Sequence, residues 1–527
     1  MKRKAAAVCD QRYHGTMTVF MGMTLLMILS VFFSLLEVNH YQALKKEARE
    51  VSGIGMESMF ADYCRVLWDQ YGILGIDGGY GSSKLDLDMT STRMTDYLLD
   101  NLSVPSSSRS SHHLQMTVSD CNVSGYGLLC DGHGRMLLKE CAKNALYGLP
   151  DGVLEGLQEQ VGTVGESELD WQDMLDNGQD AYESAWEDYE DDEDDDDDED
   201  DDDDDDEDAG EKWHYERPPG GLSEQEAYSV GNPIEEIMEW KARGVLKQVL
   251  PDQAVSTKTF VVDTLPSHRS LSSGTLPADG TLSPLERLLC QYYFLDKFSS
   301  FVHPMHRKGM YYEVEYLIGG ENSDKENLAQ TVEELLVFRG AMNLGSLVSD
   351  PKKMAEAESV ALALAGATLN PAIVEAVQAG IVAAWVYVES ILDIRTLLDG
   401  GKVAIVKTPA EWTSSILSLP ACLNVEMKAR ESRQGVSYES ALTAMLVLVS
   451  DKKLGLRAMD VLENELHGYE DYQAVKADNL IYRVKADYQY RGIPVFGSLV
   501  TIGTPPDGYE FLEEEEMSYV SDTREHK

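Results

Sequence analysis

Three cysteines and one histidine lie close together in the chain and are the first candidates for metal chemistry: Cys121, Cys130, Cys141 and His133. Structural zinc sites typically use short Cys-x-x-Cys pairs. Here eight and ten residues separate the successive cysteines, which does not fit that spacing. Seven cysteines in 527 residues are also too few for a disulfide framework. We therefore expect ordinary thiols or one local disulfide rather than a metal site.

A second candidate is the stretch HPMH, which places His303 and His306 on either side of Pro304. No H-E-x-x-H motif occurs, and no acidic third ligand is fixed by the spacing. No G-x-S-x-G motif supports a hydrolase nucleophile. The stretch GGENSDKEN is typical of a turn that leads into a helix cap, with a ligand site as the alternative. The sequence thus predicts no catalytic residue, no metal ligand and no cofactor.

The charge of the chain limits its partners. The formal net charge is −48, and residues 187–208 are acidic at every position except Tyr189. Even without those 21 charges the remainder carries −48 + 21 = −27. Such a surface repels phosphate backbones, so we expect no nucleic-acid partner. The acidic run lacks the spacing of a folded calcium loop, and we interpret residues 165–223 as a disordered linker.

The segment that must position everything else is at the N-terminus. From Thr16 to Leu36 there are 21 consecutive uncharged residues. A helix of that length is about 31 Å long, close to the roughly 30 Å hydrocarbon core of a bilayer. The run is longer than a typical signal-peptide core, and no small-residue cleavage site follows it. We predict a retained transmembrane helix over residues 16–38, with a buried soluble helix as the alternative.

The positive charges around this segment indicate its orientation. Residues 1–15 contain four Lys and Arg residues, whereas three follow closely after the segment. The positive-inside rule counts these cations and so favours a cytoplasmic N-terminus, with the bulk of the chain extracytoplasmic. The expected location is the cell membrane, with a single span.

An amphipathic pattern continues directly from the apolar segment. From Tyr41 to Tyr71 there is no proline, and apolar residues recur every three or four positions. This pattern predicts an amphipathic stem helix over residues 39–75, in which Gly53 and Gly55 could permit a bend. A helix that is embedded at first and then packed against a globular head has the shape of a type IV pilin stem.

Several stretches carry a family resemblance: GTMTVFMGMTLLMILSVFFSLLE, MESMFADYCRVLWDQYGILGID, YYEVEYLIGGENSDKENL, LDIRTLLDGGKVAIVKT and GVSYESALTAML. They resemble a clostridial domain-of-unknown-function family described as TadE/TadG-like and associated with Tad (Flp-type) pili. The resemblance implies a single-pass surface protein linked to pilus assembly. It also implies a prepilin-type cut between Gly15 and Thr16, although Phe20 stands where pilins usually have glutamate. The alternative is that Gly15 is a flexible residue before an uncleaved anchor.

The rest of the chain predicts an α+β protein. After the stem we expect a small α/β region over residues 76–164, a larger mixed α/β domain over residues 224–510 and an acidic tail over residues 511–527. Alternating patterns predict a half-exposed strand in YYEVEYLIGG and an edge or hairpin strand in YRVKADYQY, and VAIVKT is a third predicted strand. The stretch from Pro371 to Leu398 contains an uncharged run of only 13 residues, so we predict a buried core helix there.

These patterns favour a non-enzymatic membrane protein, a pilin-like minor subunit or assembly factor whose partners are the membrane and other pilus proteins. The alternatives are a stationary membrane-anchored binding or adhesion protein and, third, an extracytoplasmic hydrolase. Glu37 ends the apolar run. Its carboxylate either reaches interfacial water or sets the register between neighbouring subunits.

Overall fold

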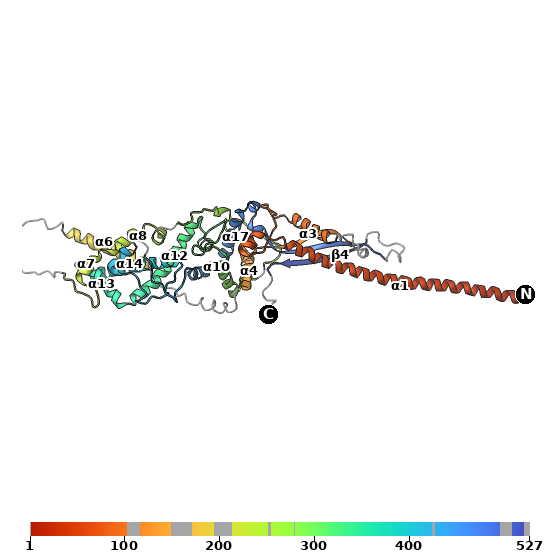
Figure 1. Cartoon of the computed structure of the whole chain (residues 1–527), viewed down its shortest axis with the longest axis horizontal. Helices are drawn as coiled ribbons and strands as arrows, with labels where there is room; N and C mark the ends of the chain where they lie inside the picture. Colours follow the sequence, from red (N-terminus) through yellow and green to blue (C-terminus); the bar gives the residue numbers. More distant parts are fainter. Residues whose placement is uncertain are drawn as a thin grey trace, which may run out of the picture. The chain divides into compact units, whose positions relative to one another are not determined.

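The chain divides into two compact units, which are described separately below. The computed structural model describes residues 2–102, 116–148, 171–193, 213–250, 254–278, 280–423, 427–495 and 508–520 (Figure 1). Unit 1 comprises Met1–Asn144, Ser270–Glu286 and Leu466–Lys527, and unit 2 comprises Ala145–Arg269 and Arg287–Glu465. The α+β class is as predicted. A contiguous domain over residues 224–510 is wrong, because two segments of that range belong to unit 1.

Unit 1 is built around an antiparallel sheet. Its strands are β1 (Ile76–Asp77), β2 (Met116–Leu128), β3 (Leu480–Gly492) and β4 (Tyr509–Ser518). The stretch YRVKADYQY forms a strand as predicted. Of the two predicted positions, the edge is wrong because β3 pairs with all three other described strands, whereas the hairpin agrees with its antiparallel pairing to β4, the next described strand along the chain. Its apolar alternate side chains are buried: Tyr482, Val484, Ala486, Tyr488 and Tyr490. β4 includes much of the predicted acidic tail, so that part of the chain belongs to the fold.

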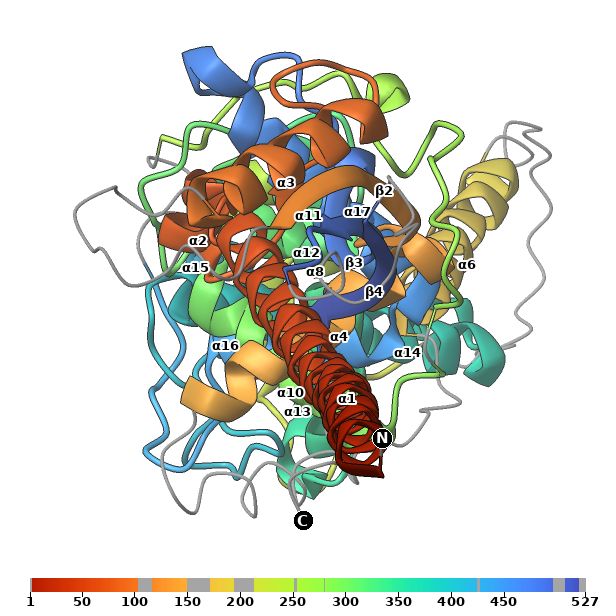
Figure 2. The same cartoon turned by 90° about the vertical axis from the view of Figure 1, so that its right-hand side faces the viewer.

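The long N-terminal helix α1 (Lys2–Phe60) packs its second half against this sheet and against α3 (Leu87–Leu102) (Figures 1 and 2). The Ser52 hydroxyl lies 2.6 Å from the Tyr490 hydroxyl. The helix α1 continues without interruption through Gly53 and Gly55, where a bend could occur. At Gly55 the packing is close: a Cβ atom would lie 2.6 Å from Leu98 Cδ2.

The stem is shorter than the pattern predicts. α1 ends at Phe60, and a separate helix, α2 (Arg65–Tyr71), follows. The chain turns between them because Cys64 is extended and its N–H donates to the Gly75 carbonyl. α2 ends at Gly72, whose φ of +68° suits glycine. Most of α4 (Asp131–Gly148) also belongs to unit 1.

Unit 2 is helical and surrounds one long helix, α14 (Pro371–Leu398). The helices that pack on it are α6 (Trp171–Glu193), α8 (Pro233–Lys241), α9 (Val245–Val249), α12 (Asp324–Val348), α13 (Pro351–Ala365) and α15 (Leu419–Leu423). The others are α7 (Glu224–Val230), α11 (Glu313–Ile318) and α16 (Tyr438–Leu448), with most of α10 (Pro284–Lys297) and α17 (Asp451–His467). Every residue of α14 from Gly380 to Leu398 is buried. The prediction of a buried core helix is confirmed.

Local signals set several helix starts as predicted. Asn232 caps α8 by accepting from the Ile234 N–H, with Pro233 in the first turn. Ser323 caps α12 by accepting from the Glu326 N–H. GGENSDKEN is therefore a capped turn, as expected. VAIVKT contributes only an isolated bridge, Val403 to Val436, and the predicted strand is wrong.

The predicted strand in YYEVEYLIGG is also wrong. This stretch forms α11, and all six of its residues are buried. The alternation suggested that Glu313 and Glu315 face solvent, whereas both carboxylates accept backbone N–H donors inside the unit, from Ser299 and Phe301 respectively. Hydrogen bonds inside the unit take the place of the contacts with water that the alternating pattern predicted for these two carboxylates.

The prediction of a disordered linker over residues 165–223 is wrong in part. Within it, α6 packs on α14, and the Trp213 ring lies against Gly366. Leu175 and Gly178 are buried one helical turn apart, which gives the acidic helix a narrow packing face. Residues 194–212, which include part of the acidic run, lie outside the described residues.

A single added methyl group tests this packing. A Cβ atom on Gly178 would lie 2.3 Å from the Gly380 Cα, so we expect Gly178→Ala to push α6 away from α14. Overpacking of this kind costs about 1–3 kcal/mol. Amide hydrogen exchange of residues 171–184 should become faster by at least tenfold. Gly345→Ala on α12 is the matched control, since nothing lies within 4 Å of its added Cβ. Unchanged exchange in Gly178→Ala would contradict the close approach of the two helices.

Candidate functional site

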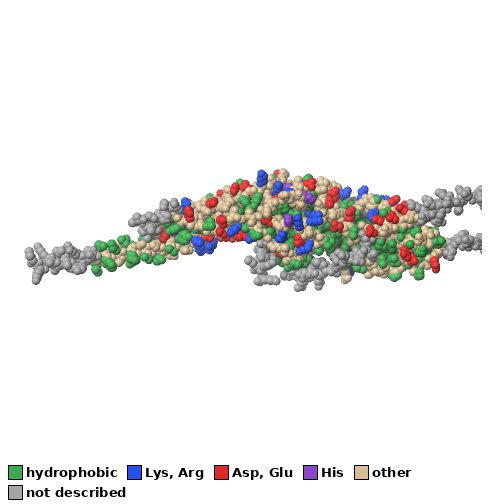
Figure 3. All heavy atoms as spheres, turned by 180° about the vertical axis from the view of Figure 1, so that it is seen from behind, with side chains coloured by type: hydrophobic (Ala, Val, Ile, Leu, Met, Phe, Trp, Pro, Cys, Tyr) green, Lys and Arg blue, Asp and Glu red, His purple; other side chains and the backbone are tan. Residues whose placement is uncertain are grey.

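The first half of α1 is a helix with unpacked apolar side chains. Ten of them from Met17 to Leu29 are exposed, and no part of the most apolar window is buried. Figure 3 shows these hydrophobic side chains in green along the helix. Two described helices are long and apolar enough to cross a membrane, this one and α14, but more than half of the α14 window is buried in unit 2. The N-terminal helix therefore has the properties of a membrane anchor or a signal sequence.

The structure places the predicted N-terminal site residues on one continuous helix. Gly15 and Thr16 lie inside α1, so no change of secondary structure marks the position of the expected cut. Phe20 is 67% exposed, among the other unpacked apolar side chains. The structure brings no other predicted site residue near Gly15 or Thr16.

Glu37 lies where the exposed apolar stretch meets the packed half of α1. The residue is 8% exposed, and its carboxylate accepts a hydrogen bond of 2.8 Å from the Tyr509 hydroxyl of β4. One turn later, His40 Nε2 lies 3.1 Å from the Ile493 carbonyl oxygen. Burial and the neighbouring carboxylate raise the pKa of Tyr509 to about 12, which keeps this hydroxyl a donor. Glu37 thus joins the stem to the last strand of its own chain, a partner that neither sequence interpretation included.

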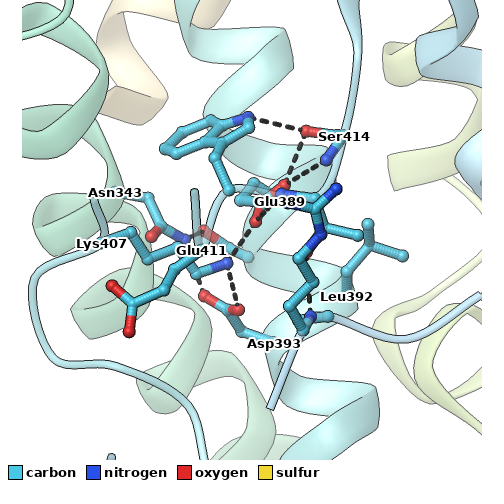
Figure 4. Close-up of polar contacts among 12 residues, drawn as sticks. Asn343, Glu389, Leu392, Asp393, Lys407, Glu411 and Ser414 are labelled. Carbon is cyan, nitrogen blue, oxygen red and sulfur yellow. Dashed lines mark hydrogen bonds and ion pairs between the residues drawn. The ribbon is translucent and has the colours of Figure 1, made fainter. Parts of the chain in front are cut away.

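A second polar cluster lies in the core of unit 2 (Figure 4). Glu389 and Asp393 project from α14 toward Lys407, which pairs with both carboxylates. Arg339 of α12 pairs with Asp393 at 2.7 Å. The two cations balance the two anions, and the four side chains are almost fully buried. We call these four residues the buried ion network.

The buried ion network fixes an irregular segment to the helical core. Residues 403–414 contain no helix or strand of their own. Lys407 belongs to this segment and pairs with the two carboxylates of α14. Glu389 also accepts hydrogen bonds from the Ser414 N–H at 2.8 Å and from the Ser414 hydroxyl at 2.6 Å. Trp385 donates to the same hydroxyl. The network therefore attaches the segment, and its charged atoms are closed to water and substrate.

A third cluster surrounds α11. Glu315 accepts from the Phe301 N–H and the Tyr438 hydroxyl, and Asp460 accepts from the Tyr316 hydroxyl and the Ser267 N–H. Burial raises the pKa of Glu315 to about 7 and that of Asp460 to about 6. Perturbed carboxylates can mark an active site. Here the two carboxylates accept hydrogen bonds from backbone N–H groups and from tyrosine hydroxyls of the same unit, so this arrangement favours a role in folding.

The other sequence candidates do not assemble into a metal site. His303 Nδ1 lies 3.2 Å from a Glu439 oxygen at the surface, and His306 is exposed. The six cysteines whose side chains the structure describes are buried thiols, and no disulfide joins any two of them, so the alternative of a local disulfide is not found among them. Within the described parts of the chain, no group of three or more His, Cys, Asp or Glu side chains is arranged to hold a metal ion.

Comparison with known proteins identifies the family. A sequence model of the family of unknown function DUF5702 matches residues 223–492, just over half of the chain. The protein belongs to this family. The DUF5702 match begins at the cap of α7 and ends with β3, and so leaves out α1 and β4. It carries no link to TadE/TadG proteins or Tad pili. No curated protein and no solved structure matches the chain.

Sequence reasoning missed the buried ion network and the carboxylates around α11. Glu389 and Asp393 were used only as charges that interrupt an apolar run. One signal was present: charges within the strongly apolar C-terminal half of α14 need partners if that helix is a core helix. The partners themselves, Arg339 and Lys407, carry no spacing signal.

Proposed function

We propose that this protein is a non-enzymatic, single-pass membrane protein whose N-terminal helix acts as anchor and stem, in the manner of a pilin. The observation that carries the proposal is the continuity of α1. One unbroken helix passes from exposed apolar side chains to side chains packed on an antiparallel sheet. In this proposal the N-terminus is cytoplasmic and both folded units are extracytoplasmic.

The physical argument rests on the cost of apolar surface in water. A helix exposing Met, Leu, Ile, Val and Phe on all sides is stable in a bilayer, where its backbone hydrogen bonds are satisfied within the helix. The hydroxyls in this stretch fit the same setting, since Thr24 and Ser34 donate to backbone carbonyls of the preceding turn. Neither hydroxyl needs a water partner.

The more specific proposal is that the protein is a minor subunit or assembly factor of a Tad-type pilus. The embedded helix would hold it in the membrane until it packs beside the helices of other subunits. Support comes from the pilin-like arrangement of α1 on its sheet and from Gly15 before the apolar run. Phe20 argues for an assembly factor over a main subunit, because pilins usually have glutamate there.

Shearing of intact cells tests this proposal. If the protein enters filaments, shearing should release it with pili, cut after Gly15, whereas membranes retain the uncut form. A Gly15→Leu variant should keep its first fifteen residues and disappear from the sheared fraction. Gly53→Ala is the matched control, since its added Cβ meets nothing within 4 Å. Membrane retention of the wild type together with copurifying pilus proteins would identify an assembly factor. Retention without them would favour a stationary binding protein. If the protein is released from the cells and is never found in the membrane fraction, the proposed anchor is overturned.

A further inference from the structure

A cavity of about 230 Å³ lies in unit 1, beside the turn that connects α1 to α2. It is bounded by the turn after Phe60, by β1 and its following loop, by α3 and by the short 3₁₀ turn Glu470–Tyr472. The side chains that give it chemical character are three tyrosines, two aspartates and one arginine: Tyr63, Tyr80, Tyr472, Asp62, Asp77 and Arg93. None of these residues has a role in the proposed anchor.

The cavity carries more negative than positive charge. Arg93 pairs with Asp62 at 2.9 Å and so neutralises it. Asp77 accepts from the backbone N–H groups of Gly79 and Gly81, at 2.9 and 2.6 Å, and has no ion pair among the described residues. Burial raises the pKa of Asp77, as expected for a carboxylate without a cationic partner. One carboxylate of this cavity therefore lacks a counter-ion.

The aromatic rings provide a second attraction for cations. The guanidinium carbon of Arg93 lies 4.6 Å from the centroid of the Tyr80 ring, so one face of this ring already holds a cation. Tyr80 has a φ of +49°, a left-handed conformation that is costly for a residue with a Cβ. The loop keeps the tyrosine in spite of this strain, which places its ring at the cavity. Aromatic rings combined with a carboxylate are the usual receptor for ammonium groups.

We propose that this cavity binds a small organic cation, through a primary or quaternary ammonium group seated between Asp77 and the tyrosine rings. Inorganic anions and carboxylates are disfavoured by the unpaired Asp77. The described residues provide no three-ligand arrangement for a metal ion. The ammonium can come from a free amine or from a lysine side chain of a partner protein, and both sources present the same chemistry.

Calorimetric titration of the full-length protein in neutral detergent tests the proposal. The probes are choline, cadaverine and a peptide containing one lysine, and 3,3-dimethylbutan-1-ol is the neutral isostere of choline. We expect choline or cadaverine to bind at least tenfold more tightly than the neutral isostere. Tighter binding of the lysine peptide than of cadaverine would indicate a protein partner as the source. Absence of binding by all three cations, or equal binding of choline and its isostere, would overturn the proposal.

Variants locate the binding in this cavity. Asp77→Asn should weaken binding at least tenfold, whereas Asp69→Asn, on the exposed face of α2, should not change it. Arg93→Gln should strengthen binding, because it removes the cation that pairs with Asp62 and frees one face of the Tyr80 ring. Unchanged affinity in a folded Asp77→Asn protein would contradict the site.

The aromatic contribution has its own control, which also applies if Asp77→Asn disturbs the loop. Tyr80→Phe keeps the ring and should keep binding, while Tyr80→Leu should lose it. Equal affinities of these two variants would overturn the role of the ring. The proposal is independent of the membrane anchor, since its failure leaves the shearing experiment unaffected and the reverse also holds.

Discussion

Replacing Lys407 by methionine is expected to lower the free energy of unfolding of unit 2 by about 3–5 kcal/mol. The substitution leaves Glu389 with no cation and Asp393 with Arg339 alone, while both carboxylates remain buried. A buried charge without its partner loses the attraction that offset its desolvation. Urea unfolding followed by tryptophan fluorescence measures the change, because Trp385 and Trp412 both donate to Ser414 beside the network.

Two comparisons separate the loss of the ion pair from the loss of a lysine. Lys402→Met removes an exposed lysine from the same irregular region and should change stability by less than about 0.5 kcal/mol. The double variant Lys407→Met, Glu389→Gln restores charge balance and should recover part of the lost stability. If Lys407→Met were as stable as the wild type, the network would contribute no attachment of residues 403–414.

Unit 2 should be more stable at pH 5 than at pH 8. Burial raises the pKa of Glu315 from 4.5 to about 7 and that of Asp460 from 3.8 to about 6. In the unfolded chain both groups release their protons at lower pH, so ionisation favours unfolding across this interval. Their contribution is complete below about pH 4 and is lost as the pH rises through about 6 to 7. For Glu315 the change is roughly 3 kcal/mol at most.

Thermal unfolding from pH 4.5 to 8, with amide exchange of α11 and α17, measures this dependence. Glu315→Gln removes the titrating group and keeps an acceptor for the Phe301 N–H and the Tyr438 hydroxyl, so it should flatten the pH dependence. Glu333→Gln, an exposed substitution on α12, should leave the slope unchanged. A melting temperature that rises between pH 5 and 8 would show that the sign is wrong.

Local signals in the sequence predicted the starts of several helices. Asn232 before Pro233 and Ser323 before Glu326 predicted the starts of α8 and α12, because a cap depends on residues within one turn. The apolar run of α14 and the packed positions of the stem followed from periodicity in the same way. Leu44, Ala48 and Val51 are buried as expected, whereas Ile54 is 45% exposed.

Features that depend on distant partners were not predictable. β3 lies in the centre of the sheet because it pairs with both β2 and β4. β2 precedes it by more than 350 residues, so the sequence of β3 alone does not reveal this pairing. α11 is a helix because its glutamates find donors in the preceding loop, which alternation cannot reveal. The acidic composition of α6 predicts disorder, and it gives no sign of the small buried face by which this helix packs. For the functional candidates, Glu37 was identified at the end of the apolar run, but its partner Tyr509 was not.

The sheet of unit 1 also sets an order of events during synthesis. α1 ends at Phe60, and the central strand β3 starts at Leu480, so 479 − 60 = 419 residues must be made between them. At about 5–20 residues per second, translation of that stretch takes on the order of 20 to 80 s. During this time the buried face of the stem has no sheet to cover it, while the residues of unit 2 are being made. Truncation anywhere before β4 removes the strand that carries Tyr509 and leaves the stem uncovered on that side. The packing of the stem in unit 1 therefore requires that β4 has been made.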